Sequence, residues 1–239
     1  MTTTTTANIL SPGAYERRAA KWATILSKIK SDALQQSFLV ATPAGQERLA
    51  YVSFPIQHIV WLMSTVGVRH IQARFLIATK KVDGQRHPYF TLALYATDAL
   101  GARVSAFYLP STYAGEPKPS ELPTEQAPHD LVKAWLNNWA TAPEITSALF
   151  ANSYGPLLGY SFSVEDFMRP LFEAQPFTNQ ELRVGFGLHE YYPALPVGAE
   201  RAYTFGLVLR LYTPPTEESA AAISSAPFFD LSTPCPPGT

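Results

Sequence analysis

The sequence predicts an α+β fold made of two similar subdomains, each a mainly antiparallel sheet with two helices packed on one face. Three observations lead to this prediction. Segments with helical periodicity are followed by segments with two-residue periodicity, this succession occurs twice, and a proline-rich stretch separates the two occurrences. The 239 residues are 46% hydrophobic and 15% charged, a composition typical of chains that bury a packed core.

The periodic segments define two repeats. We expect a flexible N-terminus at 1–10, a basic first repeat at 11–112, a Pro-rich linker at 113–128, an acidic second repeat at 129–227, and a C-terminal strand and tail at 228–239. The linker contains Pro117, Pro119 and Pro123, and closely spaced prolines favour an extended, semi-rigid chain.

Each repeat is expected to open with an amphipathic helix, because apolar residues recur on one helical face: Trp22, Ile25, Leu26 and Ile29 in the first repeat, and Leu131, Trp135 and Trp139 in the second. Asp130 is the expected N-cap of the latter helix. A short apolar strand and a second helix are predicted next, at 37–40 and 53–66 in the first repeat and at 148–151 and 161–171 in the second. Ser163 and Asp166 resemble a capping box at the start of the last helix.

The periodicity then changes to two residues, which predicts half-buried strands at 71–77 and 90–94 in the first repeat and at 182–188 and 205–209 in the second. A last strand at 104–109 corresponds to 228–231. The offset between corresponding residues grows from 108 at Ser53/Ser161 to 111 at Phe75/Phe186 and 115 at Phe90/Phe205. Insertions confined to turns are typical of a diverged duplication, because loops tolerate changes of length better than strands. The alternative is a chance likeness, since parts of any α+β chain resemble one another.

The chain ends in Phe228-Phe229-Asp230-Leu231-Ser232-Thr233-Pro234-Cys235-Pro236-Pro237. This segment resembles the C-terminal Asp-Leu/Phe-Ser/Thr-x-Pro-Cys-Pro-Pro signature of small uncharacterised bacterial proteins, and Val66-Gly67-Val68-Arg69 is similar to a strand entry of that family. The resemblance implies that each repeat corresponds to one such protein, arranged here as a tandem duplication, and it implies no activity. The first repeat departs from the pattern because it stops at Phe107-Tyr108-Leu109-Pro110 without the tail, and the second because it has Gln180-Glu181-Leu182-Arg183 at the strand entry.

The net charge of −1 hides two halves of opposite charge. Residues 1–112 carry 12 Lys and Arg against five Asp and Glu, whereas residues 113–239 carry six against 14. Such halves complement each other within one chain, or between chains in a head-to-tail contact that produces rings or open filaments. The charge pattern therefore favours a protein partner, either another protein or a second copy in a homo-oligomer.

No arrangement of residues in the sequence indicates catalysis, a cofactor or a metal ion. The histidines, at 58, 70, 87, 129 and 189, form no closely spaced pair of the kind that binds zinc. Gly185-Phe186-Gly187 lies inside a predicted strand, where glycine marks a bulge or the close approach of another backbone rather than a phosphate loop. We therefore expect no catalytic residue, no cofactor and no metal site.

The sequence also predicts a cytoplasmic protein. No apolar run approaches the roughly 20 residues that span a bilayer, and the threonine-rich N-terminus lacks the basic start and apolar stretch of a signal peptide. Cys235 is the single cysteine, so an internal disulfide is impossible.

The leading functional hypothesis is a non-catalytic interaction or self-assembly protein that uses its oppositely charged halves for association. Outward positions of the predicted strands mix Arg and Tyr with aliphatic residues, as contact surfaces do, and the tail could add a strand to a neighbouring edge. The candidate interaction surface comprises Arg69, Arg74, Lys80, Lys81, Arg86, Tyr95, Arg210, Tyr212, Phe228 and Phe229. The alternative for the strand positions is that helices of the same repeat cover them.

Two other classes of function compete with this hypothesis. A small-ligand receptor or enzyme would have its site between the repeats, around His58, Arg69, Arg74, His189 and Arg210. A nucleic-acid-binding protein would use the basic residues of the first half to contact phosphates: Arg17, Arg18, Lys21, Lys28, Lys30, Arg69, Arg74, Lys80, Lys81 and Arg86. Nucleic acid is the less favoured partner, because the acidic half repels it and the basic residues of the first helix suit a solvated helix face.

Overall fold

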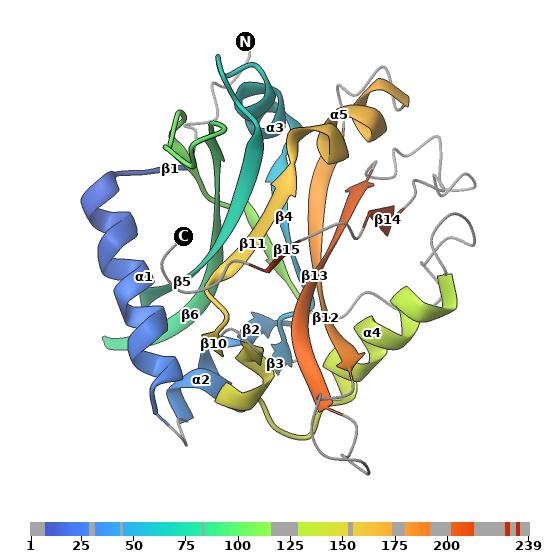
Figure 1. Cartoon of the computed structure of the whole chain (residues 1–239). Helices are drawn as coiled ribbons and strands as arrows, with labels where there is room; N and C mark the ends of the chain where they lie inside the picture. Colours follow the sequence, from blue (N-terminus) through green and yellow to red (C-terminus); the bar gives the residue numbers. More distant parts are fainter. Residues whose placement is uncertain are drawn as a thin grey trace.

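The computed structural model describes residues 8–28, 32–43, 45–82, 84–115, 129–152, 155–173, 180–191, 202–212, 228–229 and 233–234 (Figure 1). The first half contains β1 (Ile9–Leu10), α1 (Pro12–Leu26), α2 (Asp32–Ser37), β2 (Leu39–Thr42), β3 (Gly45–Arg48), β4 (Tyr51–Pro55), α3 (Ile56–Met63), β5 (His70–Val82), β6 (Gln85–Thr97), β7 (Phe107–Tyr108) and β8 (Thr112–Ala114). The second half contains α4 (His129–Thr141), the 3₁₀-helix η2 (Ser147–Phe150), β9 (Ala151–Asn152), β10 (Gly155–Pro156), β11 (Gly159–Ser163), α5 (Val164–Glu173), β12 (Glu181–Tyr191), β13 (Ala202–Tyr212), β14 (Phe228–Phe229) and β15 (Thr233–Pro234). The predicted α+β class with antiparallel sheets is confirmed.

Of the two predicted helix caps, one is present and one is displaced into the helix. Ser163 N donates to Asp166 Oδ2 at 2.9 Å and Glu165 N donates to Ser163 Oγ at 3.3 Å, which confirms a reciprocal cap at the start of α5. Asp130, by contrast, lies in the first turn of α4 and not before the helix. There its carboxylate still favours the positive end of the helix dipole.

The larger sheets of the described residues each combine strands of both halves. The first sheet has the order β1-β7-β6-β5-β11-β15, and the second sheet has the order β14-β13-β12-β4-β8. In the first sheet β11 pairs with β5, and in the second sheet β4 pairs with β12. The predicted repeats 11–112 and 129–227 are therefore not separate sheets. The hairpins β5–β6 and β12–β13 each leave one strand edge unpaired, and a strand of the other half completes it.

Five strands of the first sheet correspond to the five strands of the second, and β1 is an additional strand at the edge of the first sheet. Replacing β5, β6 and β7 by β12, β13 and β14, and exchanging β11 with β4 and β15 with β8, converts the order β7-β6-β5-β11-β15 into the order of the second sheet. The register corresponds too, because Ser161 lies opposite Gln72 and Ser53 lies opposite Arg183, positions offset by 108 and 111 residues. The duplication of an ancestral sequence stays a prediction.

The correspondence corrects one predicted boundary and the expectation that the first repeat lacks the tail. β8 (Thr112–Ala114) pairs with β4 in the place that β15 (Thr233–Pro234) has beside β11, so the first half contains a counterpart of the C-terminal tail. The domain boundary predicted between residues 112 and 113 falls inside β8. Comparison of side-chain patterns did not reveal β8, because this strand is defined by backbone hydrogen bonds, which almost any residue can form. The rest of the predicted linker, at 116–128, and Cys235 lie outside the described residues.

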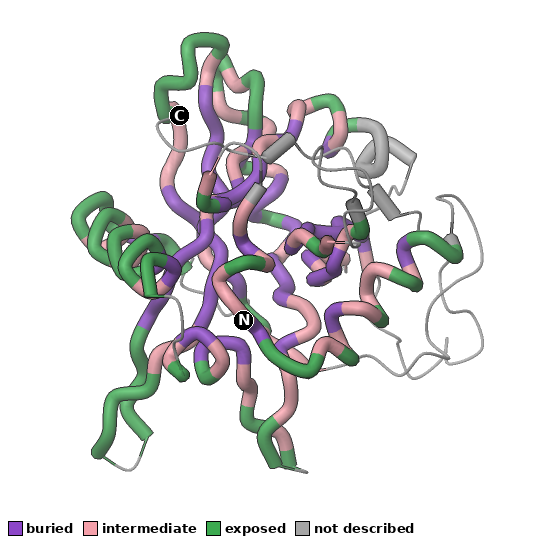
Figure 2. Tube along the Cα trace, turned by 60° about the horizontal axis from the view of Figure 1, so that its bottom comes forward, coloured by how far each residue is buried: buried purple, intermediate pink, exposed green. Residues whose placement is uncertain are grey.

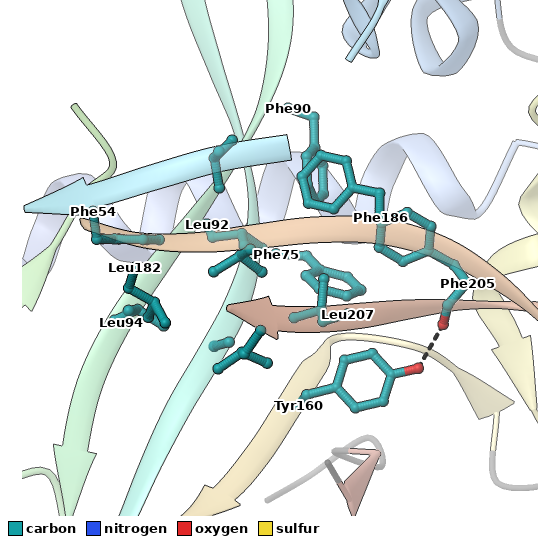
Figure 3. Packing of buried hydrophobic residues seen from close by; sticks show 14 of the residues in the cluster. Phe54, Phe75, Phe90, Leu92, Leu94, Tyr160, Leu182, Phe186, Phe205 and Leu207 are labelled. Atoms are coloured by element: carbon teal, nitrogen blue, oxygen red, sulfur yellow. Dashed lines mark hydrogen bonds between the residues drawn. The ribbon is translucent and has the colours of Figure 1, made fainter. Parts of the chain in front are cut away.

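The inner faces of the two sheets pack on each other through a core rich in aromatic rings (Figure 3). Phe75 of the first sheet contacts Phe205 of the second with 5.5 Å between ring centroids, and Phe186 of the second contacts Phe90 of the first at 5.5 Å. Tyr160 donates a hydrogen bond to the carbonyl of Phe205. The space between the two halves is thus filled by side chains, and the burial of these rings contributes the main stabilisation.

Two buried tryptophans connect the halves in corresponding ways. Trp22 Nε1 donates to the carbonyl of Leu157 at 3.0 Å, and Trp139 Nε1 donates to the carbonyl of Leu49 at 2.8 Å. Each acceptor lies just before the exchanged strand of the other half, β11 or β4. Both indoles are 1% exposed. Each hydrogen bond therefore fixes one helix to the strand that the other half contributes.

The helices do not pair on one face of each sheet as predicted. α1 covers the outer face of the first sheet, where Tyr15 and Ala19 contact a buried cluster that includes Leu76, and α4 covers the outer face of the second sheet (Figure 1). α3 and α5 contact each other at one end of the molecule. Buried residues concentrate along the central strands, and exposed ones along the outer sides of the helices and at hairpin ends (Figure 2). Within the described part of the chain, none of the helices has the length and apolar character needed to cross a membrane.

Candidate functional site

The strand positions of the predicted interaction surface are largely covered in the first sheet. Tyr95 is 8% exposed and packs edge-to-face on Tyr15 of α1, with 5.8 Å between ring centroids. Arg74 Nε donates to the Tyr95 hydroxyl at 3.3 Å. These residues form part of the contact between helix and sheet, so the interpretation of Tyr95 as a partner-binding residue is wrong. Periodicity identified the outward face correctly but could not show that α1 covers it.

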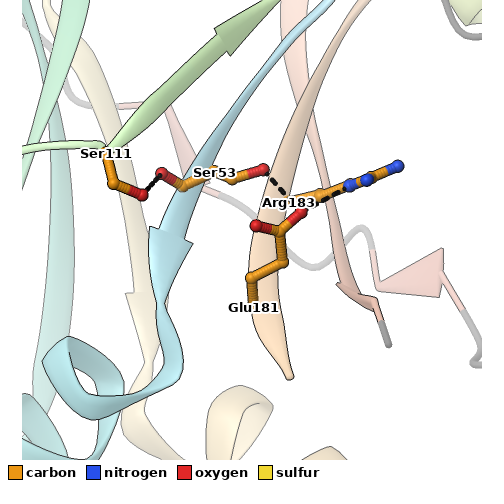
Figure 4. A network of polar contacts seen from close by, with 4 residues as sticks. All are labelled: Ser53, Ser111, Glu181 and Arg183. Atoms are coloured by element: carbon orange, nitrogen blue, oxygen red, sulfur yellow. Dashed lines mark hydrogen bonds and ion pairs between the residues drawn. The ribbon is translucent and has the colours of Figure 1, made fainter. Parts of the chain in front are cut away.

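Arg210 and Tyr212 lie on the outer face of the second sheet, beside a polar network (Figure 4). Arg183 Nε lies 2.8 Å from Glu181 Oε1, Ser53 Oγ donates to the same oxygen at 3.0 Å, and the Arg183 guanidinium lies 3.1 Å from the centre of the Tyr212 ring. Arg210 is 7% exposed. Burial lowers the pKa of Arg210, and the charge of Arg183 on the neighbouring strand lowers it further. These partners lie within the fold, so the network is structural.

The remaining positions of the predicted surface are divided between an edge and two exposed segments. β14, with Phe228 and Phe229, pairs with β13 of its own chain, where Phe228 lies opposite Arg210. Arg69 is exposed between α3 and β5. The other exposed members are the hairpin residues Lys80, Lys81 and Arg86.

The residues of the predicted receptor site are not brought together. Arg74 lies on the outer face of the first sheet, whereas His189 and Arg210 lie on the outer face of the second. His58 is 3% exposed in α3, with its ring 4.9 Å from that of Tyr108. Burial lowers the pKa of His58, so its ring is neutral at pH 7. The core fills the space between the halves, and the prediction of a site there is wrong for these residues.

The hairpin residues instead line a groove with α1, which we call the basic groove. Its volume is about 430 Å³, and its lining consists of Ala14, Arg17, Arg18 and Lys21 of α1 and Ala78, Thr79, Lys80, Lys81 and Arg86 of the β5–β6 hairpin. The two sides come from separate elements because α1 runs across β5 on the outer face of the first sheet. The lining contains six cationic side chains and no carboxylate among the described residues.

The cations of the basic groove are not neutralised by the described part of the chain. None of the six forms an ion pair there. Lys21 Nζ donates to Thr79 Oγ1 at 3.1 Å, which holds the ammonium across the groove. Arg18 Nη1 is buried and has no hydrogen-bond partner among the described residues. Six like charges that line one groove raise the local potential and favour an anion.

Arg18 of the groove interacts electrostatically with Tyr113 of β8. Burial raises the pKa of Tyr113 to about 12, its hydrogen bond to Thr91 counteracts this shift, and the positive charge of Arg18 lowers the pKa slightly as well. The Tyr113 hydroxyl lies 2.7 Å from Thr91 Oγ1 and its ring packs edge-to-face on Tyr89. The phenol is therefore neutral at pH 7 and contributes no negative charge to the groove.

The corresponding place on the second sheet is filled. Because Trp22 corresponds to Trp139, Arg18 corresponds to Trp135, and the strand offset of 111 pairs Ala78 with His189. Trp135 stacks on His189 with 3.8 Å between ring centroids and 12° between planes. The rings of Trp135 and His189 thus fill the place between helix and sheet on the second sheet. At the corresponding place on the first sheet, Arg18 and Ala78 line the groove.

Every cation of the groove was named among the basic residues of the first half that could contact phosphates, but the sequence did not predict that these six line one groove. Arg17, Arg18 and Lys21 were assigned to a solvated helix face. Lys21 and Thr79 are 58 residues apart, and only the packing of α1 on β5 brings them together. A metal centre has no support in the described residues, where no group of three His, Cys, Asp or Glu side chains could hold an ion.

Comparisons with models of known protein families, with characterised proteins and with solved structures each found no match to this chain.

Proposed function

We propose that this chain is a non-catalytic interaction protein that binds an anionic partner in the basic groove. The observation that supports this proposal is the convergence of six cationic side chains on one groove without a carboxylate in its described lining. Such an arrangement is unfavourable without counterions, and an anionic ligand gains both attraction and the release of those ions. A solvated helix face would spread its charges outward, whereas these charges face one another across a groove.

The excess charge of the first half agrees with this proposal. Residues 1–112 carry seven more basic than acidic residues, and the basic groove contains six of these basic side chains. The ion pair between described residues, Arg183 with Glu181, lies within the acidic half. Surface cations without internal partners steer anions and speed association, and salt weakens this effect.

Retention on a heparin column in a salt series tests the proposal. Lys80→Glu/Lys81→Glu reverses two groove charges, and Lys28→Glu/Arg69→Glu makes the same change of net charge at exposed cations that do not line the groove. We expect the groove variant to elute at much lower salt and the control variant to elute near the wild type. Equal losses in both variants would contradict the proposal, because net charge alone would then explain retention.

The acidic half of a second copy is one candidate for the anionic partner. Residues 113–239 carry 14 acidic against six basic residues, so a head-to-tail contact between copies would match opposite charges. Light scattering in a salt series tests this version. We expect a molar mass above that of the monomer at low salt and dissociation at high salt, and a monomer at all concentrations and salts would exclude self-assembly.

A further inference from the structure

We propose that the basic groove takes a compact ligand with adjacent phosphate groups, such as a free polyphosphate or the phosphate chain of a nucleotide. This inference rests on the proposed function, because it names the chemical class of the anion that the groove binds. Three features of the groove favour phosphate over the carboxylates of a protein surface: its small volume, the type of its donors and its density of charge.

The shape suits a small ligand. A volume of about 430 Å³ lies within the range of about 300–1,000 Å³ that small-molecule sites occupy. Three cations come from α1 and three from the hairpin, so a bound anion is contacted from two sides. The contacts converge on one place and do not follow a line along the surface, as the contacts to an extended polymer would.

The donors suit phosphate oxygens. Arg18 lines the groove, and its Nη1 is buried without an acceptor among the described residues. A buried donor on a charged group is costly when it is unpaired, so an acceptor from a ligand would stabilise this arrangement. The guanidinium binds phosphate with paired hydrogen bonds, Lys21 adds a point charge, and the hydroxyl of Thr79 can donate its proton to a further oxygen.

The charge suits a chain of phosphates. A terminal phosphate group carries about −1.5 to −2 at pH 7, whereas a carboxylate carries one charge. Adjacent phosphates therefore place several negative charges within one groove that is lined by six cationic side chains. An acidic protein surface would need several side chains to enter the same volume.

Single-stranded nucleic acid fits the groove less well. Proteins bind it by stacking bases on aromatic rings, and no aromatic residue belongs to the described lining. Tyr89 and Tyr113 pack on each other, and the Tyr113 hydroxyl lies in a hydrogen bond with Thr91. Nucleic acid is therefore an outcome that the experiment must separate from the proposed ligand.

Calorimetric titration of the full chain with inorganic tripolyphosphate tests the inference. Arg18→Gln/Lys21→Gln removes two groove charges, and Lys28→Gln/Arg69→Gln removes two elsewhere. A third variant, Arg18→Trp/Ala78→His, introduces the two residues that fill the second sheet. We expect the wild type and the control to bind equally, the first variant to bind at least about tenfold more weakly, and the third to show no binding, with unchanged circular dichroism in all.

Parallel titrations with ATP, poly-L-glutamate and single-stranded DNA distinguish a nucleotide, an acidic protein surface and a nucleic acid from free polyphosphate as the ligand. Tighter binding of ATP than of tripolyphosphate supports a nucleotide, and the reverse order supports free polyphosphate. Tighter binding of poly-L-glutamate or of DNA than of either phosphate compound overturns the inference but leaves the proposed anion-binding function intact. If none of the four probes binds and the heparin result is also negative, both proposals are wrong.

Discussion

Each of the two outer sheet faces of this protein is covered by one helix, but the helix packs closely on the second sheet and leaves a groove on the first. On the second sheet, Gly187 lets the backbone of α4 approach so closely that a Cβ on this residue would lie 3.1 Å from the Cβ of Trp135. On the first sheet the corresponding residue is Leu76, and α1 rests on larger side chains. The second face is therefore packed and the first retains the basic groove. A few changes of side-chain size decide whether the same helix and sheet form a closed surface or a binding site.

The largest expected effect on stability comes from removing either of the two buried tryptophans, and it tests whether the two halves are equivalent in the core. Trp22→Ala and Trp139→Ala each remove a fully buried ring and leave a carbonyl of the other half without its donor. Each change is expected to lower the free energy of unfolding by about 3–5 kcal/mol, measured by urea denaturation. Trp61→Ala, at a position 40% exposed, serves as the control and should cost much less. A large difference between the Trp22 and Trp139 variants would break the equivalence.

The next effect tests the close approach of α4. Gly187→Leu copies the residue of the first sheet into the second, where the backbone of Trp135 leaves no room for it. We expect a loss of about 1–3 kcal/mol in thermal or urea unfolding, because the helix must move outward. Gly13→Ala is the control, since its new methyl group makes only an ordinary van der Waals contact, 3.5 Å from Arg17 Nη1, and adds helix propensity. An unchanged stability of Gly187→Leu would show that α4 is not held by this contact.

A smaller effect concerns the polar groups beside the exchanged strands. Gln72 of the first sheet donates to Ser161 at 3.0 Å, and at the corresponding place Arg183 binds Glu181, which also accepts from Ser53. Arg183→Gln introduces the residue of the first sheet and should cost about 1 kcal/mol, because it removes an ion pair at a half-buried place and a stacked cation. In a double-mutant cycle with Glu181→Gln, the double variant should cost less than the sum of the single variants. Additive losses would contradict a coupled network.

The smallest effect concerns pH and two residues at corresponding places, His58 in α3 and Asp166 in α5. Burial lowers the pKa of His58 below 6.5, so the unfolded chain binds the proton more readily and stability falls as the pH drops from about 7 toward 5. Burial raises the pKa of Asp166 above 3.8. The folded chain therefore binds this proton more readily than the unfolded chain, and the stability that Asp166 contributes is greatest below pH 3.8 and is lost as the pH rises through the folded pKa.

Thermal unfolding between pH 3 and 8 separates these two residues. His58→Gln should reduce the loss of stability between pH 7 and 5, and Asp166→Asn should alter the profile only in the acid range near pH 4. The wild type serves as the reference for both. An unaltered slope between pH 7 and 5 in the His58 variant would show that another group causes it.

The strands and their faces were predictable because they depend on neighbouring residues. Alternation placed Phe75 and Phe186 on inner faces, and the offset between them matches the observed register. Gly187 marks a close approach of backbone, as its position inside a strand indicated. The pairing of β4 with β12 was not predictable, because backbone hydrogen bonds carry no information about which half supplies the strand.

The candidate site was harder to predict than the fold. Arg18 and Lys80 were both recognised as basic, but charged residues on an exposed helix face, like Arg18, are usually solvated. Their shared groove depends on where α1 crosses the first sheet and on the small side chain of Ala78. Tyr95 was placed on the correct face and still misinterpreted, because the residues that cover it lie 80 positions away at Tyr15.

The amino-acid sequence thus specifies the elements, the buried faces and the opposite charges of the halves, since these follow from local periodicity and composition. The exchange of β4 and β11 between the halves, and the groove lined by six cations, arise when distant segments pack. The physical reason is that a sheet edge accepts any strand of suitable backbone geometry, so the aromatic core and the two tryptophan hydrogen bonds select the partner. The charges of α1 and the hairpin become a site only through the position at which that core places them.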